Sequence, residues 1–225
     1  LKKGMFYFSF LILKIKMDIV NLKPIPIGYE RKAYQLNKKE LKIIQDIQYI
    51  KPDPTAYAGG GRDFYLSKSG TLLENKGLTN LKNFFIQKAK EYTQDILQIK
   101  DKLYMTQSWS TVHKTDAFHP PHDHPNTFLT SVYYVQCEDG AIFFELKRSS
   151  ICEAFNFQYT IDKHNVYNSQ VWRMPITTGD IVLFPGQLFH GTPPNKLKQP
   201  RIILGANFFI KGVLGTEEEK SIIKI

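Results

Sequence analysis

Histidines are the residues of this sequence whose type and spacing most directly suggest chemistry. Four of the six lie in the stretch from His113 to His124, HKTDAFHPPHDHP, and His190 stands apart in FPGQLFHGTPPN. Side chains on a β-strand point to the same face at every second residue, so His122 and His124 could both reach one metal ion. His190, from a distant strand, could complete a set of three ligands that leaves coordination positions open. We therefore predict a metal centre made by His122, His124 and His190.

A surface loop is the alternative setting for these histidines, because Pro120, Pro121 and Pro125 surround them. The pair His122 and His124 does not by itself decide between a loop and a metal site. That decision depends on the elements that would position the pair and on the segments that follow it.

Two amphipathic helices are expected before the histidines. Apolar residues recur with helical spacing from Asn37 to Lys51 and again from Asn80 to Ile99, and Thr79 or Asn80 is the candidate N-cap of the second helix. Between the helices, the segment from Pro52 to Asn75 is rich in proline and glycine, which predicts an irregular loop. Its three successive glycines lack the preceding strand and the following Lys-Ser/Thr pair of a phosphate-binding loop.

After Lys100 the sequence changes to short runs rich in Thr, Val, Ile, Phe and Tyr, separated by Gly and Pro. Strands of this length and spacing favour an all-β sandwich or barrel, such as a double-sheet jelly roll. The predicted strands are Tyr104 to His113, Thr127 to Gln136, Ala141 to Leu146, Gln170 to Met174, Asp180 to Pro185 and Ile202 to Ile210. The predicted fold class is thus mainly β with N-terminal helices.

The length and composition indicate one folded domain. A chain of 225 residues with 42% hydrophobic residues can bury one sizeable core and is too short for two comfortable ones. We expect a single domain over residues 17–225, with helical support over about 37–100 and the β core over about 104–212. Residues 1–16 read as a non-native extension or a disordered N-terminus, because Met17 opens a natural start and the apolar stretch before it is too short to span a bilayer.

The charge balance and the cysteine count narrow the classes of partner and compartment. A net charge of +9 is compatible with an anionic partner, but the lysines are scattered along helix faces and no nucleic-acid motif stands out. Only Cys137 and Cys152 are present, so neither a disulfide framework nor a cysteine-based zinc site is expected. A cytoplasmic protein without a membrane span fits best.

The segments after the histidine pair form an ordered pattern. They are a strand with the pair Tyr133-Tyr134, the segment from Gly179-Asp180 through IVLFPGQLFH to His190, and Arg201 at the head of the strand IILGANFF. In this order the sequence resembles the 2-oxoglutarate/Fe(II) oxygenase superfamily, specifically its prolyl-hydroxylase-like branch and the related small bacterial and phage oxygenases. The resemblance covers about Trp109 to Lys211 and implies a double-stranded β-helix core, which is the jelly roll of cupin-like proteins.

The resemblance also implies roles for single residues. His122 and His190 take the two histidine ligand positions for Fe(II). Arg201 would form a bidentate pair with the distal carboxylate of 2-oxoglutarate, for which a planar guanidinium is well suited. Tyr134 would donate its hydroxyl to the same carboxylate, and Asn207, on the same strand face as Arg201, would line the cosubstrate pocket. The implied enzyme is a dioxygenase that consumes 2-oxoglutarate and O₂, releases succinate and CO₂, and hydroxylates a prolyl or other protein side chain or a small metabolite.

The third metal ligand departs from the superfamily pattern. Where most members have a carboxylate, this sequence has His124, and Asp123 is the alternative. Asp123 is the middle residue of the His-x-His pair, so it should face away from the ion, and the related small oxygenases share the His-x-His-Pro pattern. We therefore expect His124 as the ligand. An imidazole in place of a carboxylate leaves the site one unit more positive, which favours an anionic cosubstrate.

Two other classes of function remain as alternatives. A cupin-like protein could bind metal through three histidines without 2-oxoglutarate, and a jelly roll could serve as a non-catalytic binding module. Arg201 separates the first alternative from the oxygenase, since only a cosubstrate with a second carboxylate needs an arginine opposite the metal. The substrate and the oligomeric state, including a homodimer, are left open by the sequence.

Overall fold

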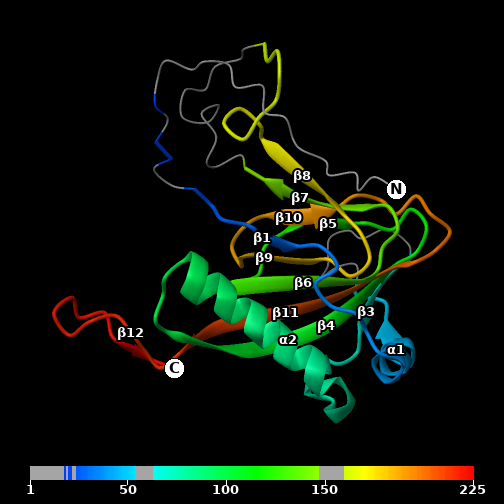
Figure 1. The fold of residues 1–225 in the computed structure, drawn as a ribbon, viewed down its shortest axis with the longest axis horizontal. Helices are drawn as coiled ribbons and strands as arrows, with labels where there is room; N and C mark the ends of the chain where they lie inside the picture. The colour runs from blue at the N-terminus through cyan, green and yellow to red at the C-terminus, as the bar shows by residue number, and fades with distance from the viewer. Residues whose placement is uncertain (1–17, 19, 22–23, 54–62, 147–159) are drawn as a thin grey trace, which may run out of the picture.

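The computed structural model describes residues 18, 20–21, 24–53, 63–146 and 160–225. The N-terminal segment 1–16 and the triple glycine Gly59 to Gly61 lie outside the described residues. Within them, the chain forms two antiparallel sheets with helices on one side, as Figure 1 shows. The predicted mainly β fold with N-terminal helices and a jelly-roll core is confirmed.

The larger sheet has seven strands, and every neighbouring pair in it is antiparallel. In spatial order the strands are β1 (Gly28–Glu30), β9 (Ile181–Pro185), β6 (Leu129–Gln136), β11 (Arg201–Lys211), β4 (Lys102–His113), β3 (Phe64–Ser67) and β2 (Tyr49–Ile50). The smaller sheet has the order β5 (His119–His122), β10 (His190–Thr192), β7 (Gly140–Glu145) and β8 (Val171–Ile176). A hairpin of β12 (Val213–Leu214) and β13 (Ile223–Lys224) follows the last long strand.

The space between the two sheets is a hydrophobic core. Alternate residues of β6, β9 and β11 point inward to meet the inner residues of β7 and β8, as period-2 side-chain alternation requires. Its buried members are Val132, Tyr134, Cys137, Ile142, Phe144, Ile176, Val182, Phe184, Leu188 and Ile203. A site between the two sheets would therefore lie against the inner face of the large sheet.

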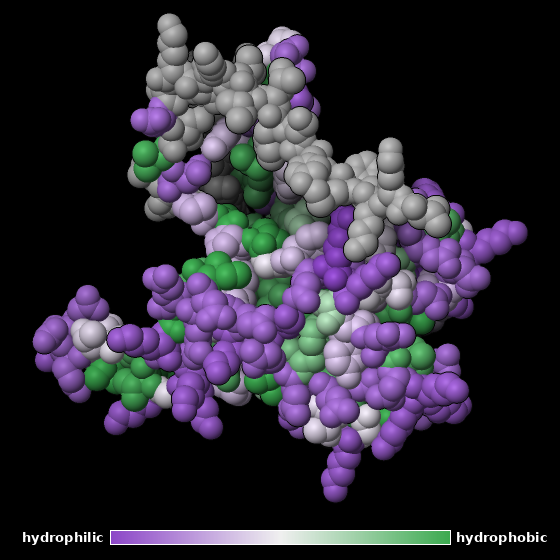
Figure 2. Space-filling view, in the orientation of Figure 1, coloured by the Kyte–Doolittle hydropathy of each residue, from purple (hydrophilic) through white to green (hydrophobic). Residues whose placement is uncertain are grey.

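Helices cover the other face of the large sheet. The main one is α2 (Thr79–Lys90), which continues as a π-helical turn, η3 (Glu91–Ile96), and is preceded by the short turns η1 (Leu72–Glu74) and η2 (Lys76–Leu78). Leu81, Phe85 and Ala89 of α2 are buried against the sheet, while its outer side carries hydrophilic residues (Figure 2). This single-sided packing is the ordinary arrangement of an amphipathic helix.

Two details of the helices differ from the sequence prediction. The first helix, α1 (Lys38–Gln45), is shorter than expected, because the chain from Tyr49 turns back into β2. The second begins at Thr79, with Leu78 as an N-cap that makes no side-chain bond, so neither Thr79 nor Asn80 is the cap. Thr79 instead donates its hydroxyl to the carbonyl of Lys76 in the preceding turn.

Among the described residues, no helix is long and apolar enough to cross a bilayer.

Candidate metal centre and cosubstrate site

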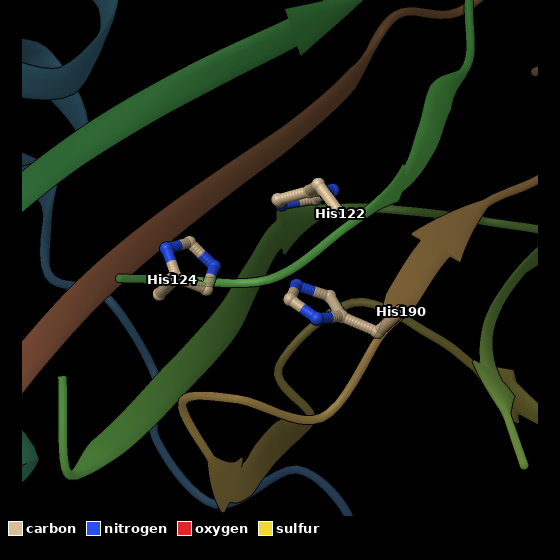
Figure 3. Close-up of side chains that lie close together, drawn as sticks. All are labelled: His122, His124 and His190. Carbon is tan, nitrogen blue, oxygen red and sulfur yellow. The ribbon is translucent and has the colours of Figure 1, made fainter. Parts of the chain in front are cut away.

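Three histidines converge between the edge of the small sheet and the inner face of the large one. His122 is the last residue of β5, His190 is the first residue of β10, and the two are direct partners in the antiparallel ladder. His124 lies two residues past the end of β5, where its backbone N–H donates to the carbonyl of Gly186 at 2.8 Å. One ligand atom from each imidazole lies within 4.8 Å of the others, and Figure 3 shows the three rings directed toward a common space. The structure brings together the three predicted ligands.

Asp123, the alternative to His124, is not part of this cluster. His122 and His124 both contribute to the cluster while Asp123 between them does not, as strand alternation predicts. Within the part of the chain that the structure describes, no carboxylate joins the three imidazoles. The donor set is therefore nitrogen only.

Backbone carbonyls fix the tautomer of two of the rings. Nδ1 of His122 lies 2.8 Å from the carbonyl of Pro120, and Nδ1 of His190 lies 2.8 Å from the carbonyl of Leu188. A carbonyl oxygen can only accept, so each Nδ1 must carry the hydrogen and donate. The lone pair of each ring is then on Nε2, which is the form that a metal ligand requires.

The third ring, His124, is held by a side-chain amide. Nδ2 of Asn207 lies 3.4 Å from Nδ1 of His124, and Oδ1 of Asn207 accepts a 3.0 Å bond from the hydroxyl of Thr130. The indole of Trp109 lies against the same ring, with centroids 5.4 Å apart. In Figure 3 the other nitrogen of His124 faces the two remaining imidazoles.

Burial keeps the imidazoles of the cluster neutral. Desolvation lowers the pKa of His124 to about 3, lowers the pKa of His122, and holds the pKa of His190 well below its ordinary value. The neighbouring imidazoles lower the pKa of His124 and His190 further, since each ring disfavours a second positive charge. Neutral imidazoles have free lone pairs near pH 7, so these three residues fit a divalent transition metal such as iron(II).

Arg201 and Tyr134 lie on the same inner face as the histidines. Arg201 is only 2% exposed, and its Nη1 donates to the carbonyl of Pro193 at 2.9 Å. Within the described structure, its Nε and the hydroxyl of the fully buried Tyr134 have no hydrogen-bond partner. Buried donors without acceptors are rare, because each costs about 1–3 kcal/mol. The pair is therefore suited to an anion, as a cosubstrate carboxylate would be.

Three contacts of the cluster were missed by the sequence reasoning. The ring of His119 is stacked on that of His122, with centroids 3.9 Å apart, and Phe184 lies 4.4 Å from His190 by the same measure. The third is the contact of Trp109 with His124. No role was predicted for His119 from the sequence, although it precedes His122 by only three residues.

A separate cleft of about 500 Å³ lies on the outer side of the small sheet. Phe143 and Arg173 line it, together with His119 and Thr192, but none of the three clustered histidines does. Because Phe143 pairs with Gly191 rather than with His190, its side chain points to the opposite face of the sheet from the cluster. The cleft therefore lies next to the candidate metal centre and does not contain it.

A jelly roll that gathers three neutral imidazoles on its inner face, beside a buried arginine, is typical of a metal-dependent enzyme. The model of the family described as "Putative 2OG-Fe(II) oxygenase" matches residues 107–207, which contain every residue of the cluster. This match supports membership of the 2-oxoglutarate/Fe(II) oxygenase superfamily.

Solved structures with the same fold include oxygenases and related enzymes. HygX from Streptomyces hygroscopicus, solved with nickel and 2-oxoglutarate, is 11% identical with a TM-score of 0.55, over 82% of each chain. The epimerase SnoN from nogalamycin biosynthesis is 13% identical with a TM-score of 0.56, over 82% of this chain and 78% of its own. A prolyl hydroxylase from Trichoplax adhaerens is 10% identical with a TM-score of 0.54, over 81% and 83%. No curated protein sequence gives a significant match.

Proposed function

We propose that this 2-oxoglutarate-dependent oxygenase hydroxylates its substrate at an iron(II) centre held by His122, His124 and His190. The observation that carries the proposal is the convergence of three imidazole nitrogens within 4.8 Å on a protein face that also buries Arg201. With iron(II) and 2-oxoglutarate bound, the centre would supply oxygen activation, with succinate and CO₂ as products and one oxygen atom delivered to a C–H bond.

The protein side chains would bind, orient and exclude water. Arg201 and Tyr134 would hold the distal carboxylate of 2-oxoglutarate, since each is buried and each has a hydrogen-bond donor without an acceptor among the described residues. Phe184 and Trp109 pack directly against ligand rings and would keep the centre dry. Water exclusion strengthens each charge-assisted hydrogen bond at the site.

The all-nitrogen donor set has an electrostatic consequence. Three neutral imidazoles leave the full double charge of iron(II), where a carboxylate ligand would cancel one unit of it. The proposed cosubstrate is a dianion, so its metal-binding end is attracted more strongly to this centre. The positive guanidinium of Arg201 would likewise attract the second carboxylate of the cosubstrate.

The same arginine argues against a cupin-like protein that does not use 2-oxoglutarate. A three-histidine centre without a dicarboxylate has no use for a buried guanidinium with a spare donor. Arg201 here is 2% exposed, and no carboxylate lies within ion-pair distance of it among the described residues. The arrangement is costly unless an anion binds there.

The substrate is the least defined part of the proposal. Among structures with this fold, one HygX structure holds hygromycin B and the prolyl hydroxylase holds a peptide fragment. Both a small metabolite and a protein side chain such as prolyl are thus compatible with this fold. Succinate release with pools of each kind, followed by mass spectrometry for the gain of one oxygen atom, would separate the two. We also propose a reducing cytoplasm, where the buried Cys137 would remain a free thiol.

An anaerobic titration tests the central claim. Addition of iron(II) and then 2-oxoglutarate should produce the weak visible charge-transfer band of the chelate. His190→Ala should lose stoichiometric iron, while Asp123→Asn should keep it. Arg201→Lys should bind iron with unchanged affinity but require far more 2-oxoglutarate for the same band, because an ammonium cannot replace the bidentate guanidinium. If the parent protein binds iron and shows no change with 2-oxoglutarate, the proposal is wrong.

A further inference from the structure

We propose that His113 is a third donor to the second carboxylate of 2-oxoglutarate, beside Arg201 and Tyr134. This inference rests on the proposed function, since it concerns the cosubstrate of the same site. It adds a residue outside the candidate metal ligands and assigns it to the recognition of one functional group.

Sheet register places the three residues together. His113, at the end of β4, is the direct partner of Arg201, at the start of β11. On the other side of β11, Tyr134 of β6 is the partner of Ile203, which shares a face with Arg201 because it lies two residues along the strand. Direct partners have Cβ atoms about 5 Å apart and diagonal neighbours about 7–8 Å. His113 and Tyr134 therefore flank the guanidinium from both neighbouring strands.

The hydrogen bonds of His113 indicate which of its nitrogens carries the hydrogen. The hydroxyl of Thr192 accepts a 3.1 Å bond from the backbone N–H of His119, and the same oxygen lies 3.4 Å from Nδ1 of His113. Since this hydroxyl already accepts, its own hydrogen is available for Nδ1. When the hydroxyl uses it there, the imidazole hydrogen of His113 is on Nε2, which has no partner among the described residues.

His113 is a neutral donor in a fully buried position. Its side chain is 0% exposed, and burial lowers its pKa to about 3, with the charge of Arg201 lowering it further. Burial also raises the pKa of Tyr134 far above its ordinary value, so that hydroxyl keeps its hydrogen. Nε2 of His113, the hydroxyl of Tyr134 and Nε of Arg201 are thus three buried donors with no acceptor in the described structure.

One anionic group can satisfy three such donors. A carboxylate offers two oxygens with about four lone-pair positions and accepts bidentate bonds from a guanidinium. Without an acceptor, each buried donor is destabilising by about 1–3 kcal/mol. One bound anion would account for all three unpartnered donors, which lie at neighbouring positions on adjacent strands.

The position of His113 relative to the candidate metal ligands fits the length of the cosubstrate. The His113 ring lies 6.0 Å from that of His119, and the His119 ring is stacked on that of His122 at 3.9 Å. The ring of His119 thus contacts both His113 and the candidate ligand His122, so His113 lies near the candidate metal centre without being part of it. A ligand that reaches both places needs its second carboxylate several bonds away from its metal-binding end, as in 2-oxoglutarate.

The competing explanation is that His113 only fills the core. Its ring does pack on Phe64, with centroids 5.0 Å apart. Packing alone would be served as well by an aromatic hydrocarbon side chain, which would leave no unsatisfied nitrogen. The substitution His113→Phe therefore separates packing from donation.

The first experiment measures binding of two 2-oxo acids to the anaerobic, metal-loaded protein. 2-Oxobutyrate keeps the metal-binding end of 2-oxoglutarate but lacks the second carboxylate. For His113→Phe we expect the Kd of 2-oxoglutarate to rise about tenfold, with the Kd of 2-oxobutyrate and the metal affinity unchanged. His113→Gln, whose amide can donate, should restore part of the loss. His164→Phe, the same change at an exposed histidine, is the control.

The outcomes distinguish this inference from the proposed function. Equal weakening of both acids in His113→Phe would indicate a packing role and overturn the inference, as would unchanged binding of both. Failure of the parent protein to bind 2-oxoglutarate at all would instead overturn the proposed function.

A second measurement uses the parent protein, so it does not depend on a variant that folds. In the zinc-loaded protein, the Nε2–H resonance of His113 should be visible by ¹H–¹⁵N NMR because the ring is buried. Addition of 2-oxoglutarate should shift it downfield, as a new charge-assisted hydrogen bond does, while 2-oxobutyrate should leave it in place. A histidine tautomer with its hydrogen on Nδ1, or an identical shift with both acids, would contradict the inference.

Discussion

The amide of Asn207 faces Nδ1 of His124 at 3.4 Å with its nitrogen, not with its oxygen. A donor in that position requires Nδ1 to accept, which puts the ring hydrogen of His124 on Nε2. A metal bound at Nε2 needs the opposite tautomer. Metal binding by His124 therefore calls for a rotation of the amide, after which Oδ1 accepts from His124 and Nδ2 donates to the hydroxyl of Thr130. Thr130 can serve either amide orientation, because a hydroxyl both donates and accepts.

Removal of the Asn207 amide should weaken metal binding. For Asn207→Leu we expect the metal Kd to rise about 10-fold to 100-fold, as for other groups that orient a histidine ligand. Asn207→Asp keeps an acceptor for Nδ1 of His124 and should retain most of the affinity. Competition with a chelating dye measures both. Gln107→Ala, an exposed position opposite Asn207 on β4, is the control. Unchanged metal affinity in Asn207→Leu would show that His124 needs no such partner. The remaining role of Asn207 would then be the predicted one, as part of the lining of the cosubstrate pocket.

Trp109 should report metal binding by its fluorescence. Its indole lies against the ring of His124, whereas the other tryptophan, Trp172, is on β8 and is 37% exposed. Cobalt(II) should therefore quench the emission of the parent protein and of Trp172→Phe by a similar amount. Trp109→Phe should show little quenching. Equal quenching in the two variants would mean that the ion binds elsewhere.

The stability of the metal-free protein should decrease as the pH falls below about 6.5, in part through His113. Its folded pKa is lowered to about 3 by burial, and the unfolded chain takes up a proton near the ordinary value of 6.5. Between these values the unfolded state binds one proton more, so unfolding becomes easier by up to about 1.4 kcal/mol per pH unit. His113→Gln should show a correspondingly shallower dependence in urea denaturation from pH 6.5 to 4. Parallel curves for the two proteins would contradict the assignment.

Asp180 should matter for stability but not for metal. It is 1% exposed, and its carboxylate accepts from the backbone N–H groups of Lys32 and Thr177 and from the hydroxyl of Tyr29, at 3.0–3.1 Å. These bonds tie the segment around β1 to the start of β9. Asp180→Asn should cost about 2 kcal/mol of unfolding free energy, because hydrogen bonds to a charged acceptor are replaced by weaker ones.

Denaturation with and without metal measures the Asp180 effect, and Asp139→Asn, at an exposed carboxylate, is the control. A loss of metal affinity in Asp180→Asn would show that this carboxylate has more than a scaffold role.

Sequence reasoning predicted the long elements because their patterns are strong. The six predicted strands correspond to β4, β6, β7, β8, β9 and β11, since each is a run of β-branched and aromatic residues with clear ends. It did not delimit β5 and β10, which carry His122 and His190. Those strands have four and three residues, and β5 contains two prolines, so no local pattern marks them. Only pairing with other strands defines them.

Some residues of the candidate site could likewise be predicted from the sequence, and others could not. His-x-His spacing was enough to predict that His122 and His124 share a face, and the structure places them together with His190. The unpartnered nitrogen of His113 could not be predicted, because it depends on the register of β4 with β11 and on a hydroxyl from β10. Contacts that join three strands distant in the chain leave no signature in a single sequence.

His122 of β5 and His190 of β10 are direct partners in the smaller sheet, so a metal ion bound by both would also hold these two strands together. β5 is an edge strand, and Pro120 and Pro121 have no N–H with which to join its neighbour. An ion bound by the two histidines would therefore stabilise β5, which has few backbone hydrogen bonds to β10. We expect amide hydrogens of β10 to exchange faster with solvent deuterium when a chelator removes the ion, and the cell's supply of ferrous iron would then govern how much of the protein survives proteolysis.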